Sequence, residues 1–202
     1  MRLADRHDLR PLSLGRQHVI AAVAITAVTL LALSAQGRPW WCACGSPVPW
    51  SSDINGAHNS QHFLDPYTVS HFEHGLLFFA ALLLLPGVAL AWRFVGAIAL
   101  ECAWELLENS SFIIDRYRAA TISSDYYGDS VLNSLSDVIF AGLGFLVAWQ
   151  IAKRAKLGWP AWWAVVIACE LGLILAVRDS LMINVIMLVH PIDAIRAWQS
   201  AS

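Results

Sequence analysis

Residues 18–35 read HVIAAVAITAVTLLALSA, an apolar run without Asp, Glu, Lys or Arg. Four further apolar runs follow it, at residues 71–91, 94–112, 131–151 and 160–177. A bilayer core of about 30 Å takes about 20 mostly apolar residues in a helix, so each of these runs is long enough, or nearly so, to cross a membrane. A sixth run, Leu181–Val189, is too short to cross and predicts an interfacial or re-entrant helix that ends before Pro191.

The composition points to the same class of protein. The chain has 202 residues, of which 57% are hydrophobic and 14% are charged, with a net charge of −2. A soluble domain usually has about 25% charged residues. Intrinsic disorder is excluded by the apolar content, and nucleic-acid binding is not expected because the 13 Lys and Arg residues form no basic face. We therefore predict an all-α, single-domain polytopic membrane helix bundle over residues 1–202, in contact with membrane lipids, with about five transmembrane helices plus the short C-terminal helix.

Basic residues predict the direction of insertion, because they favour the cytoplasmic side of a membrane. With a cytoplasmic N-terminus, the inner segments contain Arg2, Arg6, Arg10, Arg16, Arg93, Lys153, Arg154 and Lys156, and the outer segments contain Arg38, Arg116, Arg118, Arg178 and Arg196. Residues 1–17 are then a cytoplasmic tail, and residues 36–70 and 113–130 are outer loops. An alternative for the first run is a signal peptide with a small-x-small cleavage site at residues 32–34.

Two of the apolar runs carry polar side chains on one helical face. At about 100° per residue, Glu101, Glu105 and Glu108 fall within about 60° of one another. The fourth run begins with a second stripe at a spacing of four residues, formed by Asp129, Asn133 and Asp137. Ionisable groups inside a membrane cost about 2.5–3.5 kcal/mol each and are candidates for function.

The second run adds His71 and His74 near its start, and the fifth contains Glu170. With a rise of about 1.5 Å per residue, these imidazole and acidic groups all lie within about 16 Å of the outer end of their helices. We therefore expect acidic and imidazole groups from four helices to meet in one layer under the outer surface. Glu73 points away from that layer, towards the headgroups.

Several carboxylates in a low dielectric repel one another, so they must share protons, pair with cations or bind a metal. Few cationic side chains are available near this layer, which favours a divalent metal. The predicted ligands are His71, His74, Glu105, Glu108 and Asp137. Imidazole with carboxylate suits Zn, Mn or Fe, whereas carboxylate with amide and carbonyl oxygen suits Ca or Mg. The predicted catalytic residues are Glu101, Glu105, Asp129 and Asn133, with Glu101 or Asp129 as the base. Purely structural roles remain as alternatives, above all a helix N-cap for Asp129.

The two outer loops carry further candidates. His58, His62 and Asp65 precede the second run and are expected to fold over the acidic layer as a lid. A disulfide between Cys42 and Cys44 is strained by their spacing, so pairing with a partner and metal binding are alternatives. In the second loop Arg116, Arg118 and Tyr127 are predicted to bind the substrate, because guanidinium groups suit a headgroup phosphate.

Three strings are distinctive: SQHFLDPYTVSHFEHG at residues 60–75, WELLENSSFIIDRYR at 104–118 and SSDYYGDSVLNSLSD at 123–137. They resemble an uncharacterised family of bacterial multi-pass membrane proteins, domain of unknown function 2585. The resemblance implies an inner-membrane location and no particular activity. A looser likeness is to the VanZ-like proteins, with His71 or His74, Glu105 or Glu108, and the Asp129/Asn133 helix start as counterparts.

Three classes of function fit these patterns. The first is a membrane-embedded hydrolase or transferase, metal-dependent or with a His–carboxylate base, that acts on a lipid or lipid-linked envelope substrate at the periplasmic leaflet. The second is a proton- or cation-coupled transporter. The third is a non-catalytic assembly or accessory protein whose polar layer binds a partner helix.

Overall fold

The computed structural model describes residues 12–154 and 158–201, and all of the regular structure in these ranges is helical. Its elements are α1 (Arg16–Ala35), α2 (Thr68–Leu82), α3 (Leu90–Glu108), α4 (Ser111–Ala120), α5 (Val131–Lys153), α6 (Gly158–Val177), α7 (Leu181–Val189) and α8 (Asp193–Ser200). The predicted all-α class is confirmed for this part of the chain. Arg2, Arg6, Arg10 and Lys156, on which the predicted orientation partly rests, lie outside the described residues.

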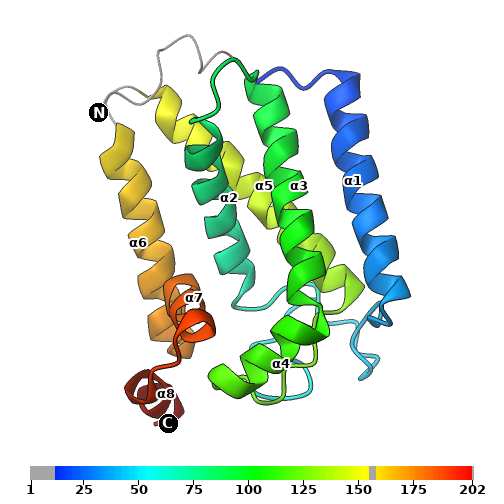
Figure 1. Cartoon of the computed structure of the whole chain (residues 1–202), viewed down its shortest axis with the longest axis vertical. Coiled ribbons are helices and arrows are strands. Elements are labelled where there is room, and N and C mark those ends of the chain that lie inside the picture. The colour runs from blue at the N-terminus through cyan, green and yellow to red at the C-terminus, as the bar shows by residue number, and fades with distance from the viewer. Residues whose placement is uncertain (1–11, 155–157, 202) are drawn as a thin grey trace.

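The five longest helices lie side by side and alternate in direction along the chain (Figure 1). The loop between α1 and α2, the short helix α4, and α7 and α8 gather at one end of this bundle, the lower end in Figure 1. We call this end the loop end. The alternation agrees with the up-and-down order that the five apolar runs predict.

Three of these helices, α1, α5 and α6, are long and apolar enough to cross a membrane, which indicates membrane association. That is fewer than the five predicted. Helix α2 has only 15 residues, and the 19 residues of α3 include Arg93 and three glutamates. Both helices instead line the interior of the bundle, where Arg93, Glu101 and Glu105 are almost fully buried.

Several boundaries differ from the sequence prediction. The second run was expected to continue to residue 91, but α2 ends at Leu82, because Pro86 lacks an amide hydrogen and Gly87 has a φ of +75°. The predicted outer loop 113–130 contains most of α4, and α8 was not predicted. Helix α7 has the predicted bounds, and the Ser180 side chain caps it by accepting from the Ile183 amide.

The centre of the bundle depends on close packing of α2 against α5. A methyl group at Gly75 would overlap the carbonyl oxygen of Ala141, and one at Gly144 would overlap the carbonyl oxygen of Phe72. The two backbones are therefore in direct contact. On the side of this contact away from the loop end, the buried core continues with Leu76, Phe79, Leu90, Ala97, Phe145, Ala148 and Trp162.

We predict that Gly75→Ala destabilises the protein by at least about 2 kcal/mol, because overpacking that moves two backbones apart exceeds the usual cost of an added methylene. Gly172→Ala is the matched control, since no described atom lies within 4 Å of a Cβ at this position in α6. Thermal unfolding of the purified variants in detergent measures the difference. Equal melting temperatures for the two variants would contradict the close contact.

Candidate functional site

A carboxylate held between two imidazoles joins α2 to α3. His71 Nδ1 lies 2.5 Å from Glu101 Oε1, and His74 Nδ1 lies 3.0 Å from Glu101 Oε2. Glu101 is 0% exposed and the His71 side chain 9% exposed. The spacing of three residues puts both imidazoles on one face of α2, and they contact edge to face with ring centres 5.2 Å apart. The structure thus brings together one predicted base, Glu101, and two predicted metal ligands.

The remaining acidic groups lie around His71. Glu105 Oε1 is 3.4 Å from His71 Nδ1, and Asp137 Oδ2 is 3.9 Å from His71 Nε2. Glu105 is 0% exposed, and neither of its carboxylate oxygens has a hydrogen-bond partner among the described residues. A carboxylate that accepts no hydrogen bond in the interior is costly, so this position favours a proton or a cation.

Two groups of three side chains in this layer have ligand atoms within 4.8 Å of one another. One is His71 with Glu105 and Glu108, and the other is His71 with His74 and Glu101. The predicted metal set is therefore divided: His74 lies with Glu101 rather than with Glu105 and Glu108. Asp137 belongs to neither group in the described part of the chain, although it faces the second nitrogen of His71.

Asp129 lies just before the N-cap of α5 and is held by the side chains of Asn109 and Tyr126. Asn109 Nδ2 donates to Asp129 Oδ2 at 2.8 Å, the Asp129 amide donates back to Asn109 Oδ1 at 2.7 Å, and the Tyr126 hydroxyl donates to Asp129 Oδ1 at 3.0 Å. The N-cap of α5 is Ser130, whose side chain accepts from the Asn133 amide, so the alternative of a capping role for Asp129 is wrong. Sequence reasoning missed Asn109 and Tyr126 as partners of this carboxylate.

Asn133 connects α5 to the loop between α1 and α2. Its Nδ2 donates to the His62 carbonyl oxygen at 2.8 Å and to Asp65 Oδ2 at 3.3 Å. Asp65 Oδ1 accepts from the amides of Tyr67 and Thr68 at the start of α2. Burial, with a smaller contribution from the Asp129 carboxylate, raises the pKa of Asp65 to about 6. The predicted catalytic residue Asn133 therefore also holds the loop in place.

A cavity of about 50 Å³ lies beside these side chains at the loop end. Its described lining residues come from the α1–α2 loop, the α4–α5 connection, α2, α3, α4, α5 and α7, and include His71, His74, Glu108, Asp129, Asn133 and Asp137, but not Glu101 or Glu105. A buried water needs at least about 10–15 Å³ on this measure, so the cavity has room for an ion with a few waters. Trp104 and Leu181 provide an apolar part of its rim.

The side chains predicted to bind the substrate are used elsewhere. Arg116 Nε donates to the Leu188 carbonyl oxygen at 2.7 Å and so ties α4 to the end of α7. Arg118 donates to the Ser124 carbonyl oxygen at 3.1 Å and lies 4.5 Å from the centre of the Tyr127 ring. None of Arg116, Arg118 and Tyr127 is among the described residues that line the cavity.

Two glutamates also differ from the prediction. Glu73 was expected to face the headgroups but is 1% exposed. Glu170 was expected in the acidic layer, but its carboxylate accepts from the amide of Met182 at the start of α7, at 3.0 Å. Neither residue lines the cavity, as far as the described residues define it.

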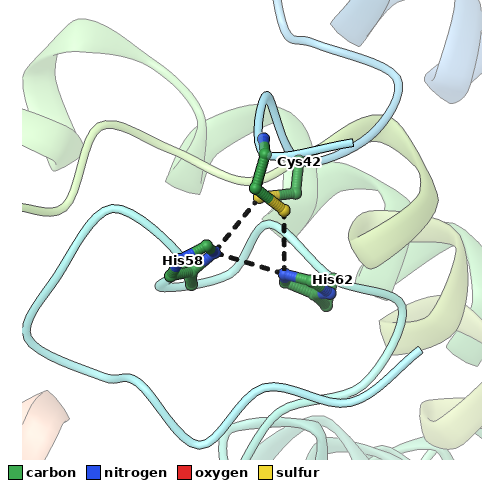
Figure 2. Close-up of side chains that lie close together, drawn as sticks. Cys42, His58 and His62 are labelled. Atoms are coloured by element: carbon green, nitrogen blue, oxygen red, sulfur yellow. Dashed lines mark hydrogen bonds between the residues drawn. The ribbon is translucent and has the colours of Figure 1, made fainter. Parts of the chain in front are cut away.

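A second cluster lies in the α1–α2 loop and consists of Cys42, Cys44, His58 and His62, whose ligand atoms lie within 4.8 Å of one another. Figure 2 shows Cys42, His58 and His62 turned towards one centre. Both cysteines are free thiols. The prediction of a lid over the acidic layer grouped His58 and His62 with Asp65. The signal for the cluster was the pair of short spacings: the cysteines are at positions i and i+2, and the histidines at i and i+4.

The fold and the site together describe a helical, membrane-associated protein with a buried imidazole–carboxylate cluster at one end. Residues 33–201 match the family described as protein of unknown function (DUF2585). The chain belongs to this family, as its three distinctive strings predicted.

The relatives extend over most of the chain. A UPF0314 protein of Paracoccus denitrificans is 46% identical over 166 residues, covering 82% of this chain and 83% of the relative. A UPF0314 protein of Sinorhizobium fredii is 43% identical, and the match covers 90% of this chain and 90% of the relative. A UPF0314 protein of Sphingopyxis alaskensis is 41% identical, and the match covers 93% of this chain and 97% of the relative. No solved structure is a significant match. The likeness to VanZ-like proteins receives no support.

The raised pKa of Asp65 predicts a pH-dependent stability. Because the folded pKa of about 6 lies above the usual 3.8, folding favours the protonated carboxyl. The stabilisation is fully present below about pH 4 and is lost as the pH rises through about 6. At about 1.4 kcal/mol per pKa unit, its full size is on the order of 3 kcal/mol in the free energy of unfolding. Asp65→Asn should remove this part of the dependence. Melting temperatures of both proteins between pH 4 and 7.5 measure it, and parallel profiles would show that Asp65 is not the titrating group.

Proposed function

We propose that this protein is a multi-pass protein of the bacterial inner membrane, with a cytoplasmic N-terminus and the loop end at the periplasmic face, and that α2 and α3 cross the membrane with α1, α5 and α6. The burial pattern of α3 supports this arrangement. Its glutamates face the interior, and its exposed positions are Trp92, Leu100, Ala103 and Leu107. A helix of this kind presents an apolar side to lipid and keeps its charges inside the bundle.

The proposed activity is metal-dependent hydrolysis or group transfer on a lipid or lipid-linked envelope substrate at the periplasmic leaflet. The observation that carries this proposal is the placement of His71 between the Glu101 and Glu105 carboxylates on one side and Asp137 on the other, at the wall of a cavity. The alternatives of transport and of an accessory role are separated from it by the tests below.

The balance of charge supports a bound cation. Two imidazoles, of His71 and His74, lie among six carboxyl groups, of Asp65, Glu101, Glu105, Glu108, Asp129 and Asp137. If all of these were charged, the six carboxylates would exceed the two imidazolium groups by four negative charges. No Lys or Arg is among the described residues that line the cavity. Protons or a divalent metal must therefore compensate the excess.

The hydrogen bonding of His71 suits a metal ligand. Nδ1 is the nitrogen beside Glu101, so in the neutral Nδ1–H tautomer the imidazole would donate to that carboxylate and keep a lone pair on Nε2 for a metal. A carboxylate behind a histidine in this way orients the ring and raises its basicity towards a metal. Nε2 faces Asp137 at 3.9 Å, whereas Glu105 lies 3.4 Å from Nδ1 and forms a group of possible ligands with His71 and Glu108. A metal at this place would lower the pKa of a bound water and so supply a nucleophile.

The surroundings of the cavity favour chemistry at one face over passage through the bundle. Leu76, Phe79 and Phe145 are almost completely buried and pack together on the side away from the loop end. The cavity lies at the loop end of this core, and Trp104 and Leu181 are apolar members of its lining. A mixed polar and apolar lining suits a substrate with a polar head and an acyl or prenyl chain that remains in the membrane.

Metal content tests the site. The Glu105→Gln protein should contain one equivalent less of divalent metal than the wild-type protein, both purified in detergent. Elemental mass spectrometry measures the metal content. Glu73→Gln is the matched control, because Glu73 is an equally buried glutamate that belongs to none of the groups of possible metal ligands among the described residues. Equal metal content in the two variants would contradict a metal at Glu105.

Lipid analysis tests the activity. Deletion of the gene should lead to accumulation of one lipid or lipid-linked species, which the wild-type and Glu73→Gln proteins reverse and the Glu105→Gln protein does not. An unchanged lipid profile would contradict the enzymatic function and favour the accessory role. Cation flux into proteoliposomes that Glu101→Gln abolishes would favour transport instead.

A further inference from the structure

The cluster in the α1–α2 loop has the composition of a closed metal site. Cys42, Cys44, His58 and His62 provide two sulfur and two nitrogen ligands. They lie on a loop outside the membrane layer and share no residue with the cavity lining in the described chain. Their chemistry also differs, because sulfur and imidazole select softer ions than carboxylates do.

The distances within the cluster fit a tetrahedron around zinc. Cys42 Sγ is 3.3 Å from His58 Nδ1, Cys44 Sγ is 3.7 Å from His62 Nε2, and the two histidine nitrogens are 3.4 Å apart. With Zn–S of about 2.3 Å and Zn–N of about 2.0–2.1 Å, a regular tetrahedron has S–N edges of about 3.6 Å and an N–N edge of about 3.4 Å. The two observed S–N distances lie on either side of the ideal S–N edge, and the observed N–N distance matches the ideal N–N edge.

The surrounding hydrogen bonds prepare the ligand atoms. His62 Nδ1 lies 2.6 Å from the Val48 carbonyl oxygen, so the proton is on Nδ1 and the lone pair is on Nε2, which faces the cluster. The amides of Cys44 and Ser46 donate to the sulfur atoms of Cys42 and Cys44, both at 3.4 Å. Donors of this kind stabilise thiolates, which are the form that binds metal.

We propose that Cys42, Cys44, His58 and His62 bind one zinc ion in a structural Cys₂His₂ site. All four positions of the tetrahedron are protein ligands, which is the pattern of structural zinc and leaves no place for a substrate. Binding of Zn²⁺ displaces one proton from each of the two thiols and forms two Zn–S bonds without a change of oxidation state. Ligation also protects the thiols from oxidation at the periplasmic face.

The zinc site positions the roof of the cavity. The His62 carbonyl oxygen accepts from Asn133, and the Ser60 carbonyl oxygen accepts from the Ser130 amide at 2.9 Å. Asn59 and Ser60, between the two histidine ligands, line the cavity itself. A metal that fixes His58 and His62 therefore fixes the segment that covers the imidazole–carboxylate cluster.

The test uses the full chain purified in detergent, with zinc content and the spectrum of the Co²⁺-substituted protein as readouts. The wild-type protein should bind one zinc that Cys42→Ser and His62→Gln lose, and the Co²⁺ form should show tetrahedral visible bands with sulfur-to-cobalt charge transfer. Cys169→Ser is the matched control, because Cys169 lies in α6 away from the cluster. Glu105→Gln should keep the sulfur-to-cobalt band, so failure of the proposed membrane site does not affect this result.

A second measurement on the wild-type protein avoids the risk that a variant fails to fold. Maleimide should label two further thiols per chain after a chelator removes the zinc, and re-addition of Zn²⁺ should restore their protection. A Cys42–Cys44 disulfide in the protein as isolated, thiols that label equally before and after chelation, or a different metal on these sulfur atoms would each overturn the proposal.

Discussion

The contact between the α2 and α5 backbones determines where the functional groups lie. Gly75 and Gly144 allow each helix to touch a carbonyl group of the other, and no larger side chain fits at either position. One turn towards the loop end, the same contact places the His71 ring beside Asp137. An expansion of this contact would separate the imidazole from the carboxylates, so the packing of two glycines is a requirement of the site as well as of the fold.

The loop between α1 and α2 completes this arrangement at the start of α5. The first amides of an α-helix lack partners within the helix. Here the carbonyl oxygens of Pro39, Trp40 and Ser60 accept from the amides of Val131, Leu132 and Ser130, respectively. The loop is therefore a structural extension of α5, and its cysteines and histidines are held above the acidic layer by backbone bonds as well as by the proposed metal.

Periodicity predicted the faces of the helices but not the partners of individual side chains. Glu101, Glu105 and Glu108 share a face because the spacing in an α-helix requires it. That Glu101 rather than Glu105 lies between the two histidines depends on the rotation of α3 against α2, which a local pattern does not contain. The end of α2 at Leu82 was missed for a related reason: residues 83–91 are almost as apolar as the helix, and only Pro86 and Gly87 indicate the turn.

The four-residue cluster of the loop shows a different limit. Cys42 and Cys44 are separated from His58 and His62 by a segment without regular structure, so sequence spacing alone does not determine whether they meet. Arg116 and Arg118 illustrate the converse case. Guanidinium groups suit phosphate, but they also satisfy exposed carbonyl oxygens, and in this protein they are used for the ends of α7 and the α4–α5 connection.

These arginines bear on how a substrate would reach the cavity. A space of about 50 Å³ admits an ion and waters but not a lipid headgroup, so under the proposed activity on a lipid the reacting bond would have to approach through a wall that moves. Helix α7 is the wall with the fewest apolar anchors: Met187 is its only buried residue within the described chain, and polar contacts from Arg116 and Glu170 hold its two ends. Displacement of α7 exchanges hydrogen bonds for similar bonds to water or headgroups and exposes little core, whereas displacement of α2 or α5 would open the glycine contact. Access along α7 therefore leaves the imidazole–carboxylate cluster in its assembled geometry.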